Sequence, residues 1–233
     1  SFAPHRREPR AAERGQNGVA NNPMSRLLRW LTDPQYRTVT RWYAEQQDDR
    51  LRFDYGLKSG DVVFDVGAYK GEYAVRIAKT EGVIVHAFEP VPVFARDLEQ
   101  ATASLANVQV HNFGLAASDV SATMTLDGLA SSRNRSNEAA IRAQFRSIVD
   151  VMRELAPNGV KLMKMNIEGD EYDTLPALNA AGLLPRVGNL LVQFHLISRG
   201  DKRRYAETAA MLSRTHELAW RYPFVWESWR LRG

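Results

Sequence analysis

The sequence predicts one α/β domain: a mostly parallel, seven-stranded sheet with helices on both faces and an antiparallel hairpin at its end. Three observations support this prediction. Five short apolar runs alternate with helical stretches, which is typical of a parallel sheet. The C-terminal stretch "HELAWRYPFVWESWRLRG" holds two more strand-like runs around Pro223, with almost no room for a helix between them. With 233 residues, 44% of them apolar, the chain is long enough to bury one sizeable core.

Two segments precede the predicted sheet. Residues 1–23 are rich in Arg, Asn, Gly and Pro and show no periodicity, so they are expected to form a disordered basic arm. Residues 24–56 form an N-terminal helical segment, in which apolar residues at helical spacing are interrupted at Pro34 and predict two short helices. The main domain is then predicted to span residues 57–233.

The elements of this domain follow one another in a regular order. Strands are predicted at 61–66, 83–89, 108–115, 161–168 and 189–196, and helices at 72–79, 93–105, 138–155 and 171–180. One segment breaks the rhythm: "DGLASSRNRSNEAA", residues 127–140, is polar and too long for a tight connection. It is expected to be a loop beside the strand ends, and both a lid and a plain surface loop fit its composition.

Composition excludes several kinds of site. The chain has no cysteine, which excludes disulfides, thiolate zinc sites and cysteine nucleophiles. The formal charge is +4, but six arginines against two glutamates fall in the first thirty residues, so a tail carries much of it and a nucleic-acid partner is not favoured. No stretch approaches the roughly 18 to 20 apolar residues of a membrane span, which predicts a soluble, cytoplasmic protein without membrane contact.

The first predicted strand runs into a glycine turn. In "VVFDVGAYKGEY", residues 62–73, the strand is followed by Gly67, Ala68, Tyr69, Lys70 and Gly71. Ligands of open α/β sheets bind at such carboxyl ends, near the point where the strand order reverses. A dinucleotide-binding turn would have its first glycine where Asp65 stands. A carboxylate there repels a pyrophosphate but can hold an ammonium or sulfonium group, so the turn predicts a cofactor without phosphate.

The second predicted strand ends in a complementary residue. Glu89 closes "VIVHAFE" about twenty residues after the glycine turn. At that spacing an acidic side chain can accept hydrogen bonds from both hydroxyls of a ribose.

Four stretches together resemble a known family. They are "VFDVGAYKGEYAVRIA", "VHAFEPVPVFARDLEQ", "VHNFGLAASDVSATMTL" and "LMKMNIEGDEYDTL". In order and spacing, over roughly residues 60–200, they resemble the FkbM-type family of S-adenosylmethionine-dependent O-methyltransferases. The resemblance implies a Rossmann-like class I methyltransferase fold, S-adenosyl-L-methionine as methyl donor, and a hydroxyl acceptor on a small molecule or a sugar.

The resemblance also assigns roles to residues of the cofactor site. The turn is expected to shape the methionine end through Asp65, Gly67 and Gly71, and Ala68 and Tyr69 within it are also expected to bind the cofactor. Glu89, with Pro90 beside it, is expected to bind the ribose. Gly114 and Leu115, after the third strand, are expected to line the adenine.

The fourth strand departs from the family pattern. The family commonly reads Lys-Ile-Asp-x-Glu-Gly there, whereas this chain reads Lys164-Met165-Asn166-Ile167-Glu168-Gly169. Asn166 removes a charge that would help to hold a metal or accept a proton, but its amide can still orient the substrate or the methionine part of the cofactor. Glu168 keeps a carboxylate at the strand end, either as a catalytic group or as an acid favoured by a helix N-terminus.

The fifth strand carries the first candidate for a general base. Gln193 and His195 stand two residues apart, so they are expected on the same side of the strand. We take His195 as the base candidate, with Glu168 second, and a structural histidine as the alternative. His86 and His111 lie within strands and are expected to be structural. Because position 193 is not a carboxylate and position 166 is an amide, we expect no bound metal and activity without divalent ions.

Three other functions are compatible with parts of this pattern. An RNA methyltransferase would use the same cofactor half and the basic tail, although no run of interleaved aromatic and basic residues is present. A nicotinamide oxidoreductase would need glycine at position 65. A non-catalytic S-adenosylmethionine-binding scaffold would be consistent with Asn166. The sequence specifies neither the acceptor nor the oligomeric state.

Overall fold

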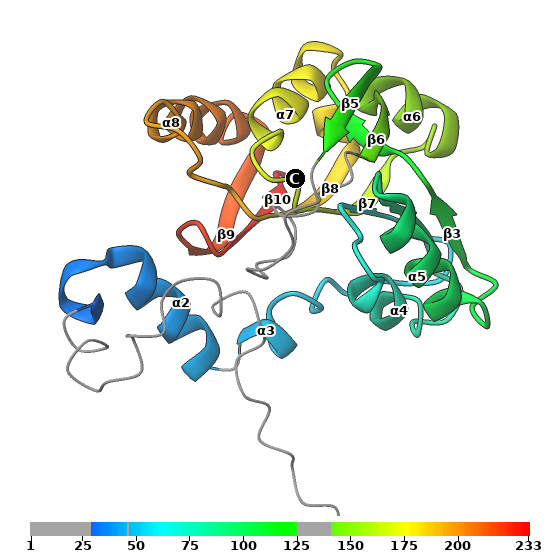
Figure 1. Cartoon of the computed structure of the whole chain (residues 1–233), viewed down its shortest axis with the longest axis horizontal. Coiled ribbons are helices and arrows are strands. Elements are labelled where there is room, and N and C mark those ends of the chain that lie inside the picture. The colour runs from blue at the N-terminus through cyan, green and yellow to red at the C-terminus, as the bar shows by residue number, and fades with distance from the viewer. Residues whose placement is uncertain (1–28, 46, 125–140) are drawn as a thin grey trace, which may run out of the picture.

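The computed structural model describes residues 29–45, 47–124 and 141–233 (Figure 1). The predicted basic arm at 1–23 and the whole of the polar loop at 127–140 lie outside these ranges. Both therefore stay predictions.

The main sheet has seven strands in the order β3-β2-β1-β7-β8-β10-β9. β10 runs antiparallel to both of its neighbours, β8 and β9, and forms a hairpin with β9, while the other neighbouring strands pair in parallel. The predicted fold class is therefore confirmed. The bounds are β1 Val62–Val66, β2 Ile84–Phe88, β3 Val108–His111, β7 Val160–Met165, β8 Val187–Val192, β9 His216–Tyr222 and β10 Trp226–Leu231.

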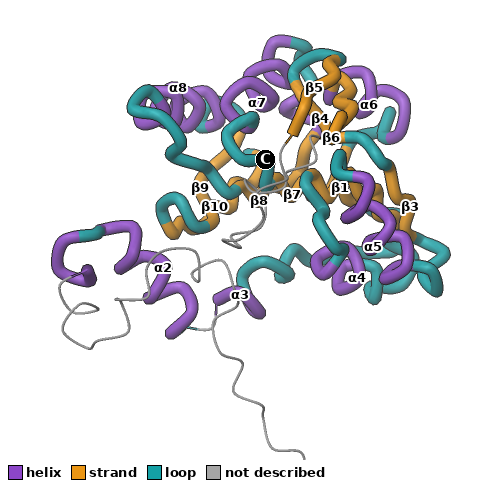
Figure 2. Tube along the Cα trace, in the orientation of Figure 1, coloured by secondary structure: helices purple, strands orange, loops and turns teal. Residues whose placement is uncertain are grey.

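Helices cover both faces of this sheet (Figures 1 and 2). One face packs against α4 (Glu72–Ile77) and α5 (Pro92–Thr102). The other packs against α6 (Ile148–Leu155), α7 (Glu171–Ala180) and α8 (Asp201–Leu212), with a 3-10 turn, η3, at Leu184–Arg186. Side chains of β1 alternate between two hydrophobic cores, one on each face of the sheet. Val63 packs into the core under α4 and α5, whereas Phe64 and Val66 pack into the core under α6, α7 and α8.

The N-terminal segment docks on the hairpin end of the sheet. Pro34 begins α2 (Pro34–Ala44) directly after the capping residue Asp33, so it starts a helix as well as ending the preceding helical turn at 29–32. A short α3 (Gln47–Arg50) follows. Trp42 of α2 is buried, and its ring lies 5.8 Å from that of Trp220 on β9. The segment thus shares a core with the domain, and the predicted boundary at 56/57 stays a prediction.

The predicted helix at 138–155 is wrong in its first half. Residues 141–147 form β6 (Ile141–Ser147), and only α6 after it is helical. β6 pairs in parallel with β4 (Gly114–Ala116) and antiparallel with β5 (Val120–Met124), which makes a second, three-stranded sheet. Partners distant in sequence decide this strand, and local helical propensity does not reveal them.

Three predicted strands are also too long, among them that at 161–168, because β7 ends at Met165, and one helix is not predicted. The predicted strand at 108–115 is divided, because β3 ends at His111 and Gly114 begins β4 of the other sheet. The predicted strand at 189–196 ends at Val192, where β8 stops. The unforeseen helix is α8. In the described part of the chain, none of the helices has the length and apolar character needed to cross a bilayer.

Candidate functional site

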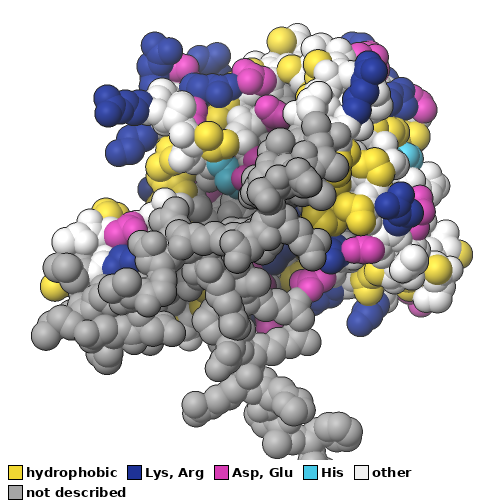
Figure 3. Space-filling model, in the orientation of Figure 1, with side chains coloured by type: hydrophobic (Ala, Val, Ile, Leu, Met, Phe, Trp, Pro, Cys, Tyr) yellow, Lys and Arg dark blue, Asp and Glu magenta, His cyan; other side chains and the backbone are white. Residues whose placement is uncertain are grey.

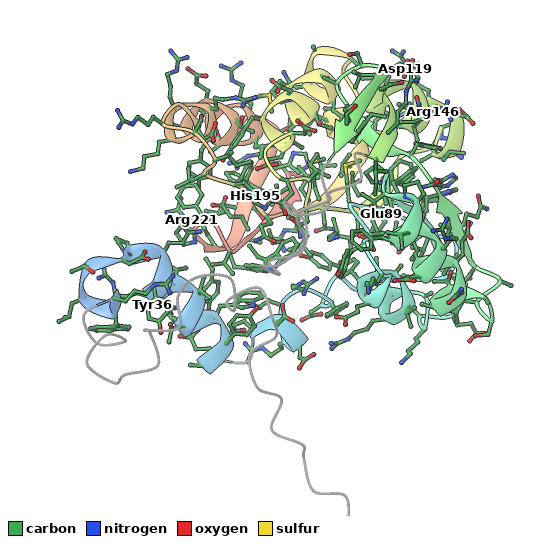
Figure 4. All side chains as sticks on the ribbon, in the orientation of Figure 1. Tyr36, Glu89, Asp119, Arg146, His195 and Arg221 are labelled. Atoms are coloured by element: carbon green, nitrogen blue, oxygen red, sulfur yellow. The ribbon has the colours of Figure 1, made fainter. Side chains whose placement is uncertain are left out.

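The predicted site residues gather at the carboxyl ends of β1, β2, β7 and β8. β1 lies between β2 and β7, so the strand order reverses here, as expected for a ligand site of an open α/β sheet. Glu89 and His195 lie on opposite sides of these strand ends (Figure 4). We call Asp65–Gly71 with Glu89 the cofactor side, and Glu168, Glu171 and His195 the acceptor side.

Backbone contact between neighbouring strand ends defines the glycine turn. Gly67 has φ +77°, and a Cβ there would lie 2.0 Å from the carbonyl oxygen of Asn166. The backbone amide of Asn166 in turn donates to the backbone carbonyl of Val66 at 3.0 Å. Position 67 therefore has to be glycine both for its conformation and for this close approach. The structure brings the backbone of Asn166 directly against the turn.

A buried ion pair lies beneath the same turn. Oδ1 of Asp65 is 2.8 Å from Nζ of Lys164, and both side chains are buried. Nζ also donates to the carbonyl oxygen of Gly67 at 2.7 Å. Burial lowers the pKa of Lys164, and the charge of Asp65 opposes that effect. Asp65 thus has a cationic partner within the protein, while its Oδ2 has no hydrogen-bond partner in the described residues.

Glu89 reaches across to the turn. Its Oε2 accepts from the amide of Tyr69, and its Oε1 accepts from the amide of Val91, both at 2.8 Å. A carboxylate has about four lone-pair directions, so two stay available for a ligand. Burial raises the pKa of Glu89, while the two amide donors and the charge of Lys164 oppose the rise.

The remaining cofactor residues differ in how accessible they are. Tyr69, at φ +53°, is half-exposed, and its ring lies 4.5 Å from that of Phe94. Ala68 is buried, and its amide donates to the carbonyl of Phe88. The αL residue before α4 is Gly71, where a Cβ would lie 2.5 Å from Leu98.

The predicted adenine residues lie beside the predicted ribose residues. A Cβ at Gly114 would be 3.3 Å from Cβ of Pro90, so β4 begins next to the Glu89–Pro90 turn. Asn112 strengthens this link by donating to the carbonyl of Glu89 at 3.0 Å. Leu115 packs into the core and is 1% exposed, so its side chain offers no surface to a ligand in this conformation.

Asn166 carries a buried acceptor that the protein leaves unpaired. Its Oδ1 has no hydrogen-bond partner within the described ranges. Leaving such an atom unpaired costs about 1–3 kcal/mol, so a donor from a ligand is expected there. The ammonium group of a methionine moiety is such a donor, and the narrow glycine turn beside it admits a ligand close to the backbone. These residues fit a cofactor with a cationic amino-acid end.

The acceptor side brings two predicted residues together. Nε2 of His195 lies 3.8 Å from Oε1 of Glu168. Glu168 has φ +52°, and its side chain is 59% exposed, whereas that of His195 is 15% exposed. Gln193 is only half-buried, and its backbone amide donates to the backbone carbonyl of Met165. Because β8 ends at Val192, strand alternation does not relate Gln193 to His195.

The sequence analysis missed one residue of this site, Glu171. It is fully buried at the start of α7. Its Oε1 accepts from the backbone amide of His195 at 2.6 Å and lies 3.2 Å from Nδ1 of the same residue. Its Oε2 accepts from the amide of Gly169 at 2.8 Å. The only sequence signal was its fixed place in the "EGDEY" stretch, where an acid at a helix start already has an ordinary explanation.

The histidine of this site carries a shifted pKa. Burial lowers the pKa of His195, but the hydrogen bond to Glu171 and the charges of Glu171 and Glu168 together raise it above 6.5. His86 and His111 differ, since burial lowers both of their pKa values, that of His111 to about 4. Those two rings stack on β2 and β3, with 3.1 Å between Nδ1 of His86 and Nε2 of His111.

Two hollows flank α7 beside this edge. One of 390 Å³ lies between the small sheet and α7, lined by Asp170, Thr174 and Phe145 among others. The other, of 470 Å³, lies between α7 and α8. Neither is lined by the glycine turn or by Glu89. Within the ranges that the structure describes, no group of three or more acidic or imidazole side chains is arranged to hold a metal ion.

Comparison with known proteins identifies a family and a fold. The model of the methyltransferase FkbM domain matches residues 65–214. A protein described as an rRNA methylase from Clostridium thermocellum superposes with a TM-score of 0.52 at 14% identity, covering 82% of this chain and 96% of that one. An rRNA methylase from Streptococcus thermophilus gives 0.50 at 13% identity, covering 76% and 90%. A search of curated proteins found no match.

Proposed function

Because the chain belongs to the FkbM methyltransferase family, we propose that it transfers a methyl group to a hydroxyl of a small molecule or a sugar. Its cofactor is S-adenosyl-L-methionine, which supplies an electrophilic methyl group on a sulfonium centre. The observation that carries the proposed O-methylation is the imidazole of His195. It lies in the segment that follows β8, with its Nε2 3.8 Å from Oε1 of Glu168.

The residues divide the work between binding and proton removal. Asn166 offers its unpaired Oδ1 to the methionine ammonium, and Glu89 offers its two free lone-pair directions to the ribose. His195 accepts the proton of the acceptor hydroxyl on Nε2, since its other ring nitrogen already faces Glu171. The sulfonium is already a good leaving group, so positioning the hydroxyl and removing its proton supply much of the catalysis.

An RNA acceptor is the second candidate. Lys and Arg side chains gather over α8 (Figure 3), where Lys202 and Arg203 are exposed. Such a basic patch can bind the phosphate backbone of RNA through charge alone. Two expectations from the sequence stay predictions: that the activity does not depend on divalent ions, and that the protein is cytoplasmic.

Transfer of a labelled methyl group tests the proposal. The protein with labelled S-adenosylmethionine is offered a panel of sugars and small hydroxylated metabolites in one arm, and total RNA in the other. Label in a small hydroxylated product supports the proposal. Label that only RNA acquires, and that ribonuclease releases, assigns the second candidate.

The variant His195→Ala tests the base. We expect the methyl-transfer rate to fall roughly 100-fold or more, because general-base catalysis contributes about 10²- to 10⁴-fold. Affinity for the cofactor, measured by calorimetry, should stay constant. Near-normal activity of this variant would make His195 structural and move the search for the base to Glu168.

A further inference from the structure

The ring of His195 is held by one buried carboxylate, and the way it is held fixes more than its position. We propose that Glu171 is the positioning residue of the acceptor side: it keeps the proton of the neutral imidazole on Nδ1, so that Nε2 is the nitrogen presented to the acceptor hydroxyl. This inference rests on the proposed function of His195 as the base.

The first step of the argument is that Glu171 joins two segments that carry site residues. One carboxylate oxygen accepts from the amide of Gly169, which follows Glu168, and the other accepts from the amide of His195. The turn after β7 and the chain after β8 are therefore tied to the same buried group. A carboxylate that accepts two backbone N–H groups is well fixed, because each such charge-assisted hydrogen bond is stronger than a neutral one.

The second step concerns the ring itself. Oε1 of Glu171 lies 3.2 Å from Nδ1 of His195. An ionised carboxylate has no proton to donate, so a hydrogen bond at this distance requires Nδ1 to carry the hydrogen. The neutral ring then has its lone pair on Nε2, which is the nitrogen a general base needs. The same carboxylate also stabilises the imidazolium that forms when Nε2 takes a proton.

The third step is that nothing else described competes for Nε2. The nearest charged group facing it is Glu168, whose Oε1 is 3.8 Å away, beyond hydrogen-bond distance, and whose side chain is largely exposed. The hydroxyl of Tyr172 on α7 donates to the backbone carbonyl of His195 at 2.7 Å and not to its ring. Asp201 of α8 accepts from the amides of Ile197 and Ser198 and so fixes the chain that follows. The ring is thus held from its Nδ1 side, and its Nε2 lies toward the exposed side chain of Glu168.

Long-range ¹H–¹⁵N NMR of the full chain tests this without any acceptor. The sequence has five histidines, and the His195 ring is identified by its absence from His195→Ala. Above its pKa, the wild-type ring should show a protonated Nδ1 and an unprotonated Nε2. The opposite tautomer would overturn the proposal, and this reading needs no variant of Glu171 that folds.

Glu171→Gln then tests the charge. We expect the proton affinity of His195 to fall roughly tenfold or more, and the acid limb of the rate profile to move to lower pH with it. The rate constant kcat should fall roughly tenfold or more while the cofactor Kd stays constant. The matched control is Asp170→Asn, which removes one negative charge from the same turn without a contact to the ring, and should change the proton affinity less than about threefold.

If Glu171→Gln and Asp170→Asn lowered the proton affinity of His195 equally, Glu171 would act only through its negative charge, and its positioning role would be overturned. The two proposals fail separately. If His195→Ala is fully active, the base assignment falls whatever the tautomer is. If that variant is inactive and Nε2 carries the proton, His195 is still needed for activity, but the role of Glu171 in setting the tautomer falls.

Discussion

The two sides of the functional edge are fixed by different kinds of contact. On the cofactor side the backbone itself is in contact, since Gly67 lies against the carbonyl of Asn166 and the backbone amide of Asn166 donates to the carbonyl of Val66. On the acceptor side a side chain makes the link, because Glu171 ties His195 to Gly169. The close approach at the glycine turn is therefore constrained by main-chain geometry, and the acceptor side by one buried charge.

This difference explains which half can be predicted from a sequence. A backbone contact requires glycine at one position, and that requirement leaves a visible mark next to a strand. A carboxylate clamp leaves only a glutamate at the start of a helix, which the helix dipole already favours. The glycine turn is predicted for the first reason, and Glu171 is overlooked for the second.

The largest expected effect breaks the backbone contact of the cofactor side. Gly67→Ala places a Cβ 2.0 Å from the carbonyl oxygen of Asn166, in a backbone conformation with φ +77°. We expect a loss of more than about 3 kcal/mol in the free energy of unfolding, or a variant that does not fold. Urea denaturation measures this loss.

The chain offers a matched control for that variant. Gly182 has a similar φ of +71°, but an added Cβ would meet nothing within 4 Å. Gly182→Ala should therefore cost only the conformational penalty, about 1–2 kcal/mol. Equal losses in the two variants would show that the contact with Asn166 contributes nothing, and that the two sides do not differ as described.

A smaller effect separates binding from chemistry. Glu89→Ala should weaken S-adenosylmethionine binding by about 1–3 kcal/mol, because charge-assisted hydrogen bonds to the ribose are lost. Calorimetry measures the affinity. Thermal unfolding checks the fold, since the amides of Tyr69 and Val91 also lose their acceptor.

The control for Glu89 is a surface carboxylate nearby. Asp97 of α5 has a side chain that is 40% exposed and that pairs with Lys70 at 3.2 Å. Asp97→Asn should change cofactor affinity less than about twofold, because exposed ion pairs contribute little. An unchanged affinity in Glu89→Ala would remove Glu89 from the ribose site.

Particular elements show where prediction from the sequence reached its limit. Apolar runs placed β1, β2 and β7 to within a few residues, because buried parallel strands are apolar throughout. The sequence pattern of β6 predicts a helix, because its partners β4 and β5 lie elsewhere in the chain and only pairing with them makes it a strand. His195 was found as a lone imidazole at a strand end, but its shifted pKa depends on Glu171, whose proximity only the fold creates.

The smallest expected effect uses the histidines to compare the two sides. The acceptor side raises the pKa of His195 through its carboxylates. Beside the cofactor side, burial lowers the pKa of His111 to about 4 and also lowers that of His86. A raised pKa adds stability below pH 6.5 that is lost as the pH rises through the folded-state value. A lowered pKa has the opposite sign: the stability is complete above pH 6.5 and is lost as the pH falls toward 4.

The variant His111→Phe isolates this second contribution. An aromatic ring can keep the stacking on Phe88, where the ring centroids are 4.7 Å apart, but it cannot take up a proton. In the wild type, the unfolded chain binds a proton at this position between pH 6.5 and about 4 while the folded protein does not, so unfolding becomes easier by about 1–2 kcal/mol. We therefore expect urea unfolding at pH 7.5 and pH 4.5 to show a smaller loss of stability for His111→Phe than for the wild type. The same loss in both proteins would mean that the stacked pair takes up its proton as readily when folded as when unfolded, and the contrast with His195 would then disappear.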